Sequence, residues 1–254
     1  MITIIMAGGI GKRMESYLPK VLHTVLIPKD INKQKVPMII HVIKKAEEIN
    51  SNKIFIIVGK YKDIIISTIK HYINLGFITG INLDYIIQNV PLGTGHAILS
   101  TLPYIHNYKK ESALILSGDV PLISLETLNN LIDDNNKLLI TELDNPEGCG
   151  RIIFNNKKIN NIVEEKDCSI NEKEIKFVNC GIYQIKVNDL INLIPKINNF
   201  NKANEYYLTD IIGLMISHNI NIDYYILEKN KQYEIKNVNT KKDLEELNNF
   251  IETL

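Results

Sequence analysis

Apolar residues in the first half of the chain follow two patterns that alternate along the sequence. Short, nearly continuous apolar runs predict buried strands at residues 2–6, 53–58, 83–87 and 113–116. Apolar positions spaced three or four residues apart predict helices between them, at residues 37–49, 61–72 and 94–105. Strands that alternate with helices are typical of a parallel sheet with helices on its faces. We therefore expect an α/β fold built on a mostly parallel sheet.

The second half of the chain is richer in predicted strands. A turn-rich loop at 145–151 leads into a hairpin, 152–154 with 159–163, which Glu164 ends. Further strands are expected at 138–143, 176–185 and 222–227, and helices at 187–193, 209–218 and 241–251. Asn179 is a polar residue inside an apolar run, so we expect its amide to hydrogen-bond to a ligand or to a neighbouring backbone. The polar stretch 30–35 predicts a surface loop.

Composition narrows the class of protein. A chain of 254 residues with 45% hydrophobic content can bury the core of one large domain or two small ones. The 29 basic residues balance the 29 acidic ones, and no lysine-rich block occurs, so a nucleic-acid partner is not expected. The first apolar run is too short for a signal peptide, and no run reaches membrane-spanning length. We expect a cytoplasmic protein without a membrane partner.

The three cysteines do not suggest a metal site. Cys149, Cys168 and Cys180 lack the short Cys-x-x-Cys spacing of zinc sites, and any disulfide would leave one of them unpaired. We expect reduced thiols with structural roles.

The loop that follows the first strand contains the strongest candidate chemistry. Gly8, Gly9 and Gly11 lack a Cβ, so their backbone can take positive φ and bring N–H groups close to an anion. Arg13 and Lys20 add positive charge, and Arg13 is one of only two arginines in the chain. The loop therefore predicts a phosphate-binding site.

Two common glycine motifs do not fit this loop. A Walker A loop that ends at Gly11-Lys12 would need glycine at Met6 and a hydroxyl at Arg13. A dinucleotide fingerprint would place Met14 where close packing needs glycine or alanine. Neither class of site is expected.

Polar residues also follow two later strands. Gln88 comes after the third strand, and Asp119 follows the fourth within Ser117-Gly118-Asp119. Ligands of open α/β sheets bind at the carboxyl ends of the strands, so these residues should share one site with the glycine loop. A carboxylate there is placed to hold Mg²⁺ beside a polyphosphate, although a turn or cap role for Asp119 is the alternative.

Taken in order, the motifs resemble the sugar-phosphate nucleotidyltransferases, and within them the N-acetylglucosamine-1-phosphate uridylyltransferases. The resemblance extends over nearly the whole chain. The matching stretches are 6–14, 18–23, 92–97, 118–122, 148–152, 162–167, 178–182, 205–211 and 238–239. It implies a single Rossmann-like nucleotidyltransferase domain over 1–254, with a nucleotide-binding half at 1–136 and a smaller, β-rich sugar-binding half at 137–254.

The resemblance also implies roles for individual residues. The nucleotide would be held by Ala7, Gly8, Gly9, Gln88, Gly93 and Thr94. Arg13 and Lys20 would face the phosphates as catalytic residues. The sugar and its N-acetyl group would be held by Gly150, Glu164, Asn179, Tyr207 and Thr209. Asp119 and Asn239 would be the protein ligands of a catalytic Mg²⁺ ion.

The implied reaction is the transfer of UMP from UTP to N-acetylglucosamine 1-phosphate, with release of pyrophosphate. A phosphate monoester with a second pKa near ~6 is already mostly dianionic at neutral pH, so the attack needs no general base. His96 is therefore expected to be structural, orienting the turn at the start of its helix. Cys149 stands where the family more often has an aromatic residue, and the segment 28–36 is longer than the family's turn.

Alternatives remain at this stage. The acceptor could be another sugar 1-phosphate, the donor could be dTTP, or the chain could bind a nucleotide sugar without catalysis. No hexapeptide repeats follow to Leu254, so we expect neither an acetyltransferase domain nor acetyl-CoA chemistry, nor the trimer which such repeats build. The sequence leaves the oligomeric state open.

Overall fold

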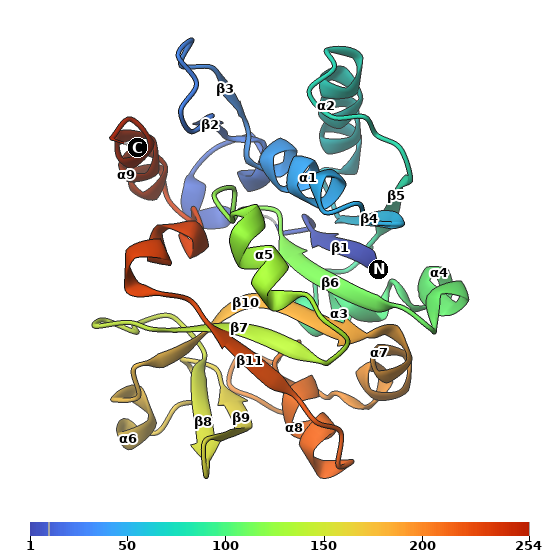
Figure 1. Ribbon diagram of the computed structural model, residues 1–254, viewed down its shortest axis with the longest axis vertical. Coiled ribbons are helices and arrows are strands. Elements are labelled where there is room, and N and C mark those ends of the chain that lie inside the picture. The colour runs from blue at the N-terminus through green and yellow to red at the C-terminus, as the bar shows by residue number, and fades with distance from the viewer. Residues whose placement is uncertain (10, 254) are drawn as a thin grey trace.

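The computed structural model describes residues 1–9 and 11–253; Ile10 of the glycine loop and Leu254 lie outside the described residues. Its described part contains one sheet of nine strands with the order β11-β7-β10-β6-β1-β4-β5, to which β8 and β9 are added through β10. Figure 1 shows this sheet running through both halves of the chain. Its strands are β1 (Ile2–Met6), β4 (Lys53–Val58), β5 (Leu83–Ile87), β6 (Ser112–Ser117), β7 (Lys137–Glu142), β8 (Arg151–Asn155), β9 (Lys158–Val163), β10 (Phe177–Lys186) and β11 (Asp223–Ile226).

The strand directions fit the prediction of a mostly parallel sheet. β1 pairs in parallel with both β4 and β6, β4 pairs in parallel with β5, and β11 pairs in parallel with β7. β10 runs antiparallel to β6, β7 and β8, and β8 forms an antiparallel hairpin with β9. The result is a mixed α/β sheet, parallel from β6 through β1 and β4 to β5, in which β10 runs antiparallel to its neighbours and β11 is again parallel to β7.

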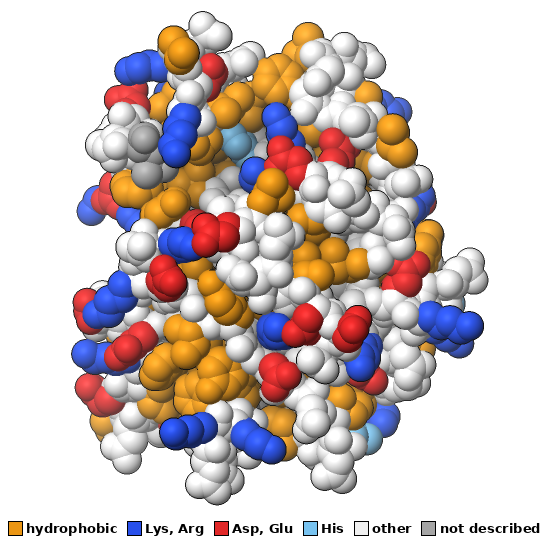
Figure 2. Space-filling model, viewed as in Figure 1, with side chains coloured by type: hydrophobic (Ala, Val, Ile, Leu, Met, Phe, Trp, Pro, Cys, Tyr) orange, Lys and Arg blue, Asp and Glu red, His pale blue; other side chains and the backbone are white. Residues whose placement is uncertain are grey.

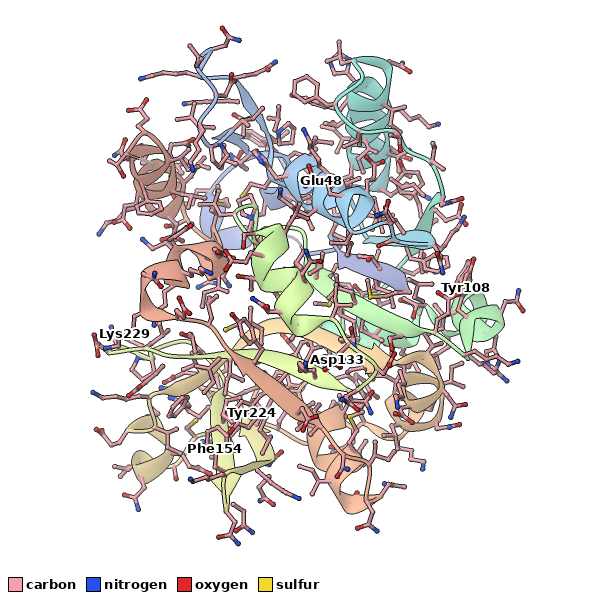
Figure 3. All side chains as sticks on the ribbon, in the orientation of Figure 1. Glu48, Tyr108, Asp133, Phe154, Tyr224 and Lys229 are labelled. Carbon is pink, nitrogen blue, oxygen red and sulfur yellow. The ribbon has the colours of Figure 1, made fainter. Side chains whose placement is uncertain are left out.

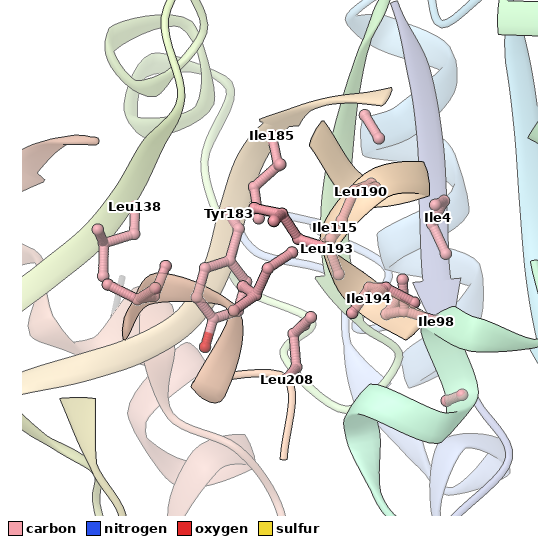
Figure 4. Close-up of a cluster of buried hydrophobic side chains, with 14 of the residues drawn as sticks. Ile4, Ile98, Ile115, Leu138, Tyr183, Ile185, Leu190, Leu193, Ile194 and Leu208 are labelled. Carbon is pink, nitrogen blue, oxygen red and sulfur yellow. The ribbon is translucent and has the colours of Figure 1, made fainter. Parts of the chain in front are cut away.

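Helices cover both faces of the sheet, as expected for strands that are apolar on both sides. The helices α1, α2 and α5 pack on one face, while α3, α4, α7 and α8 pack on the other. Figure 4 shows Ile4 and Ile115 of the sheet with Ile98 of α3 and with Leu190 and Leu193 of α7. The helices are α1 (Met38–Glu48), α2 (Lys62–Asn74), α3 (Thr94–Leu99), α4 (Leu102–Ile105), α5 (Leu125–Leu131), α6 (Ile170–Lys173), α7 (Val187–Leu193), α8 (Asp210–Ser217) and α9 (Lys241–Ile251).

The helix predicted at 94–105 is wrong as a single element. The structure has two short helices, α3 and α4, separated at Ser100 and Thr101. Pro103 lies in the first turn of α4, where its missing N–H costs nothing, but in one long helix its ring would clash with the carbonyl of Leu99. The Thr101 hydroxyl donates to the Ile98 carbonyl at 2.7 Å and helps to end α3.

A small hairpin was not predicted. β2 (Thr24–Leu26) pairs with β3 (Lys35–Pro37), and the loop between them contains most of the predicted surface segment. The hairpin packs against α9 in a third hydrophobic cluster that includes Val25, Leu247 and Ile251. The Asn248 side chain accepts a hydrogen bond from the backbone N–H of Leu26 at 2.9 Å. Figure 1 places this hairpin and α9 at one end of the molecule and β8–β9 at the other.

Aromatic rings attach the β8–β9 hairpin to the main sheet. The Phe154 ring meets Phe177 of β10 and Tyr224 of β11 edge to face, with centroid distances of 5.5 and 5.4 Å. Figure 3 shows Phe154 and Tyr224 side by side. On the face shown in Figure 2, side chains of both charge signs are interspersed, in keeping with the zero net charge. Within residues 1–9 and 11–253, every helix is too short or too polar to cross a bilayer.

Candidate active site

A pocket of about 300 Å³ lies at the carboxyl ends of β1, β5 and β6. The prediction that the residues after these strands share one site is therefore confirmed. Its described lining is Met6, Ala7, Gly8, Gly9, Lys20, Val21, Gln88, Pro91, Gly93, Thr94, Ala97, Ser117, Asp119 and Glu205. Every residue predicted to hold the nucleotide is among them.

The glycine loop brings Lys20 to the pocket. Gly11 takes a φ of +65°, and a Cβ at this position would lie 2.7 Å from the Cβ of Lys20. Any other residue would push away the lysine, so the close approach requires glycine. Gly8 and Gly9 do not take positive φ, so the conformational freedom expected of the three loop glycines is used at Gly11.

Lys20, Asp119 and Asn239 meet at one side of the pocket, although they come from distant parts of the chain. The Lys20 ammonium forms an ion pair with the Asp119 carboxylate and donates to Oδ1 of Asn239 at 3.1 Å. The other carboxylate oxygen of Asp119 accepts from the Ser117 hydroxyl. Asp119 is buried, so the ion pair is shielded from water. One oxygen of Asp119 and one of Asn239 thus hold the Lys20 ammonium group between them.

Asn239 is held by the start of α9. Thr240 and Asp243 form a capping box, and Oδ2 of Asp243 accepts from the backbone N–H groups of Asn239 and Thr240, both at 2.8 Å. Burial alone would raise the pKa of Asp243, but these N–H groups outweigh it and lower the pKa. Asp243 was not predicted as a site residue, although the spacing Thr-x-x-Asp is a recognisable signal for a helix start.

Arg13 lies apart from this cluster. It is exposed on a short 3₁₀ helix (Lys12–Met14), and it does not belong to the described lining of the pocket. Its positive charge contributes to the lowered pKa of Asp243, so it lies on the same side of the molecule as the start of α9. Its predicted contact with phosphate stays a prediction.

The Leu92–His96 segment joins the pocket to the 205–208 segment, next to the residues predicted to bind the sugar. Gly93 has a φ of +114°, and a Cβ there would lie 2.5 Å from the carbonyl oxygen of Tyr206, so only glycine fits. The backbone N–H of Gly95 donates to that same carbonyl at 2.8 Å, and the Thr94 hydroxyl accepts from the N–H of Leu208 at 3.0 Å. The start of α3 is thus fixed to the 205–208 segment.

The five predicted sugar-binding residues form a neighbouring cluster rather than part of the pocket lining. The Thr209 hydroxyl donates to Oε1 of Glu164 at 2.8 Å, and the backbone N–H of Asn179 donates to the Gly150 carbonyl at 2.9 Å. Burial raises the pKa of Glu164. Burial, followed by the nearby carboxylates, also raises the pKa of Tyr207 to about 12. Burial and the neighbouring charges of Asp167 and Glu205 thus disfavour the ionised form of both side chains.

Asn179 uses its side chain within the protein. Nδ2 donates to the Tyr183 hydroxyl at 2.6 Å, and Oδ1 accepts from the backbone N–H of Gly181 at 3.0 Å. The expected contact with a neighbouring backbone is confirmed. These bonds hold a bulge in β10 between Asn179 and Tyr183, where its register with β7 shifts.

Two further charged residues next to this cluster were not predicted. Arg151 is almost fully buried. Its guanidinium group pairs with Glu165 at 2.7 Å and donates a hydrogen bond to the Cys149 carbonyl, so it stabilises the 145–151 loop. Asp210 begins α8, and burial followed by the charges of Glu164 and Asp167 raises its pKa to about 6. Neither burial nor the like charges could be read from the local sequence.

The three cysteines were predicted to be reduced thiols with structural roles. Cys149, Cys168 and Cys180 are free in the described residues. Burial raises the pKa of the Cys149 thiol, which keeps it protonated and slow to react.

Comparisons with known proteins agree with the geometry. The sequence profile of the nucleotidyl transferase family matches residues 2–253. A protein of Acanthamoeba polyphaga mimivirus named "Probable UDP-N-acetylglucosamine pyrophosphorylase" is 41% identical over 95% of this chain and 92% of its own length. The "Bifunctional protein GlmU" of Francisella tularensis subsp. novicida is 36% identical over 96% of this chain. This chain spans about half the length of that relative, 50%.

The fold is similarly matched by a solved structure. A Bacillus anthracis crystal structure described as a "Putative Glucose-1-Phosphate Thymidylyltransferase" superimposes with a TM-score of 0.69 at 22% sequence identity, covering 100% of this chain and 96% of the other. This likeness concerns the fold alone, whereas the profile match covers nearly every residue. The chain belongs to the nucleotidyl transferase family and is a nucleotidyltransferase.

Proposed function

We propose that this protein catalyses the Mg²⁺-dependent transfer of UMP from UTP to N-acetylglucosamine 1-phosphate, giving UDP-N-acetylglucosamine and pyrophosphate. The observation that carries the proposal is the meeting of Lys20, Asp119 and Asn239 beside a pocket lined by the glycine loop. The 41% identity to the mimivirus protein supports the choice of nucleotide and sugar.

The residues present fit a magnesium ion. Mg²⁺ prefers oxygen ligands and takes only one or two from protein, so a carboxylate from Asp119 and an amide oxygen from Asn239 suit it. Both oxygens already hold a cation, the Lys20 ammonium, in the structure. When bound, Mg²⁺ would neutralise phosphate charge and orient the nucleotide.

The chain's own residues then account for the remaining requirements of phosphoryl transfer. Because the sugar 1-phosphate is mostly dianionic at neutral pH, it attacks the α-phosphorus without a general base, and pyrophosphate leaves. Lys20 supplies positive charge to the phosphates, and the backbone of the glycine loop approaches them closely. Holding the two reactants in line contributes the rest of the rate increase. Arg13 would add charge from the exposed side of the loop.

We propose that the sugar lies over the cluster of Gly150, Glu164, Asn179, Tyr207 and Thr209. Buried carboxylate and hydroxyl groups accept and donate hydrogen bonds to sugar hydroxyls and to an N-acetyl group. Residues 1–136 would bind the nucleotide and residues 137–254 the sugar within one domain. The nine-stranded sheet of the described residues, continuous through both parts, supports that arrangement.

The test is pyrophosphate release from UTP and Mg²⁺ with a panel of sugar 1-phosphates that includes the N-acetylglucosamine, glucose and galactosamine derivatives, with dTTP as a second donor. Preference for N-acetylglucosamine 1-phosphate with UTP is expected. Preference for another sugar or donor would keep the reaction class and change the substrate. No release from a folded chain with any pair would favour a protein that binds nucleotide sugars without catalysis.

A further inference from the structure

Arg151 is one of only two arginines in the chain, and it is 1% exposed. Its guanidinium group has three acceptors. It pairs with the Glu165 carboxylate at 2.7 Å, donates to the Cys149 carbonyl, and donates to the Lys173 carbonyl at 3.4 Å. A lysine could not make all three contacts, because its N–H donors leave one nitrogen atom, whereas a guanidinium spreads its donors over a planar fork. We therefore expect the shape of this side chain to matter as well as its charge.

Glu165 extends the contact to a second point of the 145–151 loop. The oxygen that pairs with Arg151, Oε2, also accepts from the backbone N–H of Gly148 at 3.2 Å. Burial alone would raise the pKa of Glu165, but the hydrogen bonds from Arg151 and Gly148 outweigh it and lower the pKa. The carboxylate is therefore ionised at neutral pH and remains an acceptor. Together, Arg151 and Glu165 fix two peptide groups of the loop.

The bond to the Cys149 carbonyl sets the direction of the next N–H group. Arginine only donates and a carbonyl only accepts, so this hydrogen bond has one possible direction. The peptide between Cys149 and Gly150 is trans, so the N–H of Gly150 points away from that carbonyl and from its arginine donor. Within residues 1–9 and 11–253, this N–H donates no hydrogen bond, although Gly150 is buried. Because a buried N–H without a partner is costly, we interpret it as a donor to a ligand.

Glu164 places an acceptor beside this donor. A Cβ at Gly150 would lie 3.5 Å from Oε1 of Glu164. Oε1 accepts from the Thr209 hydroxyl at 2.8 Å, and a carboxyl group has further lone pairs that can accept. A hydroxyl group both donates and accepts, so it fits a donor and an acceptor that lie side by side. A phosphate dianion has no proton to donate and would be repelled by a carboxylate.

We infer that Arg151 is a positioning residue which, together with Glu165, orients the N–H of Gly150 toward one hydroxyl group of the sugar. This inference rests on the proposed function, in which Gly150 belongs to the sugar-binding cluster. Arg151 does not belong to the described lining of the pocket proposed for the nucleotide. Its loss should therefore weaken recognition of the sugar and leave the binding of UTP unchanged.

The test combines one substitution with substrates that lack single hydroxyl groups. Arg151→Lys keeps the positive charge but loses the planar fork that reaches both Glu165 and the Cys149 carbonyl. The readouts are KM and kcat for N-acetylglucosamine 1-phosphate and for its 3-, 4- and 6-deoxy analogues. We expect the KM of the parent sugar to rise about tenfold in the variant, the value of one hydrogen bond, and the KM of UTP to change less than about twofold.

The deoxy analogues separate positioning from a general loss of structure. For one hydroxyl group, the rise in KM that its removal causes should be about tenfold smaller in Arg151→Lys than in the wild type, because the bond to Gly150 is already lost. The other analogues should behave alike in both proteins. Equal effects of every analogue in the wild type and in the folded variant would overturn the inference, since a purely structural loss weakens all sugars equally.

Two further variants complete the test. Lys173→Met removes a second positive charge, 4.0 Å from Glu165 and 53% exposed, but keeps the backbone carbonyl that Arg151 contacts, so it should leave the KM values unchanged. If Arg151→Lys does not fold, Glu165→Gln tests the same pair at a side chain that is 26% exposed. It should give the same pattern among the analogues with a smaller change.

The wild-type protein separates the two levels of the argument. If it prefers another sugar 1-phosphate, the deoxy analogues of that sugar are used instead. If it releases pyrophosphate but the variants lose selectivity for no hydroxyl group, positioning by Arg151 is wrong while the proposed function stands. If it releases no pyrophosphate with any sugar, the proposed function is wrong, and the inference with it.

Discussion

The two sides of the site are built from opposite kinds of chemistry. On the nucleotide side, the pocket combines a glycine loop, one buried ion pair between Lys20 and Asp119, and the neutral amide of Gln88. On the sugar side, burial raises the pKa values of both Glu164 and Asp210, and the nearby charge of Asp167 raises them further. The first side favours anions, and the second disfavours them.

This difference indicates how one site could distinguish the two ends of its proposed ligands. In the proposed function, phosphates are held by positive charge, and Gly11 is needed because a Cβ there would push away Lys20, the residue that supplies this charge. A neutral sugar is better recognised by buried acceptors, whose like charges keep a second phosphate away. The contact between Gly95 and Tyr206 joins the two sides and keeps their spacing fixed. Substitutions on the nucleotide side and substitutions on the sugar side should therefore change different properties of the protein.

The largest effect is expected at Asp119. Asp119→Asn keeps the shape but removes the charge that would hold Mg²⁺, so kcat should fall by about 10³-fold, corresponding to the several kcal/mol that a metal supplies. The measurement is pyrophosphate release over a range of Mg²⁺ concentrations. Asp134→Asn, at an exposed position, is the control and should keep wild-type turnover. A folded Asp119→Asn protein near the wild-type rate would rule out Asp119 as a metal ligand.

Lys20→Met should separate the phosphate role of this side from its metal role. Loss of the ammonium should lower kcat/KM by about 10²–10³-fold, as for other groups that stabilise transition-state charge. Affinity for Mn²⁺ in the absence of nucleotide should rise, because the Asp119 carboxylate loses its ion-pair partner. Electron paramagnetic resonance of free Mn²⁺ gives that affinity without any turnover. Lys44→Met on the exposed side of α1 should change neither quantity, and weaker Mn²⁺ binding by Lys20→Met would contradict the competition.

A smaller effect is expected at Asp243, which contacts the metal site only through Asn239. Asp243→Ala frees the backbone of Asn239, and kcat/KM and Mn²⁺ affinity should each fall about tenfold, the low end for residues behind a metal ligand. Thr240→Ala is the matched control, because it weakens the same helix cap without touching the N–H of Asn239. Equal losses of activity in the two variants would mean that Asp243 acts through helix stability alone.

The parts of the fold that follow from local pattern could be predicted well. β1, β4, α7 and α9 have the predicted bounds, because their periodicity and caps lie within each element. The β2–β3 hairpin could not be found, since each strand has three residues and its partner, α9, is about two hundred residues away. Pro103 indicates a helix break before α4, but this break was not predicted.

The residues of the candidate site can also be separated into those that local sequence rules place correctly and those that depend on distant contacts. Gln88 and Asp119 could be placed together from the rule on strand ends, and the pocket confirms their proximity. The place of Asn239 rested on family resemblance, because nothing local brings residue 239 to Lys20. The hydrogen bond between Gln88 and His96 depends on the turn between β5 and α3, whose geometry no single residue specifies. The features that the sequence could not show are those that depend on contacts between elements far apart in the chain.

The smallest effect is expected on the sugar side, in stability rather than rate. The pKa of Asp210 is raised from 3.8 to about 6, chiefly by burial, so the folded protein binds a proton there more tightly than the unfolded chain does. Stability from this residue is then lost as pH rises from about 4 to 6 and stays lost above that range. Asp210→Asn should therefore raise Tm at pH 7.5 by about 2–4 °C, corresponding to about 1 kcal/mol after discounting the shift for a half-exposed side chain.

At pH 4 the same substitution should change Tm much less, because the wild-type carboxyl is then mostly protonated in the folded protein. Asp63→Asn provides the matched control, since Asp63 is an exposed carboxylate in the first turn of α2 and loses the same favourable interaction with a helix N-terminus. Calorimetric scans of both variants at the two pH values separate the titration of Asp210 from the loss of a charge at a helix N-terminus. If Asp210→Asn shifted Tm equally at pH 4 and pH 7.5, the burial of Asp210 near Glu164 and Asp167 could not be what destabilises the charged form of its carboxyl group.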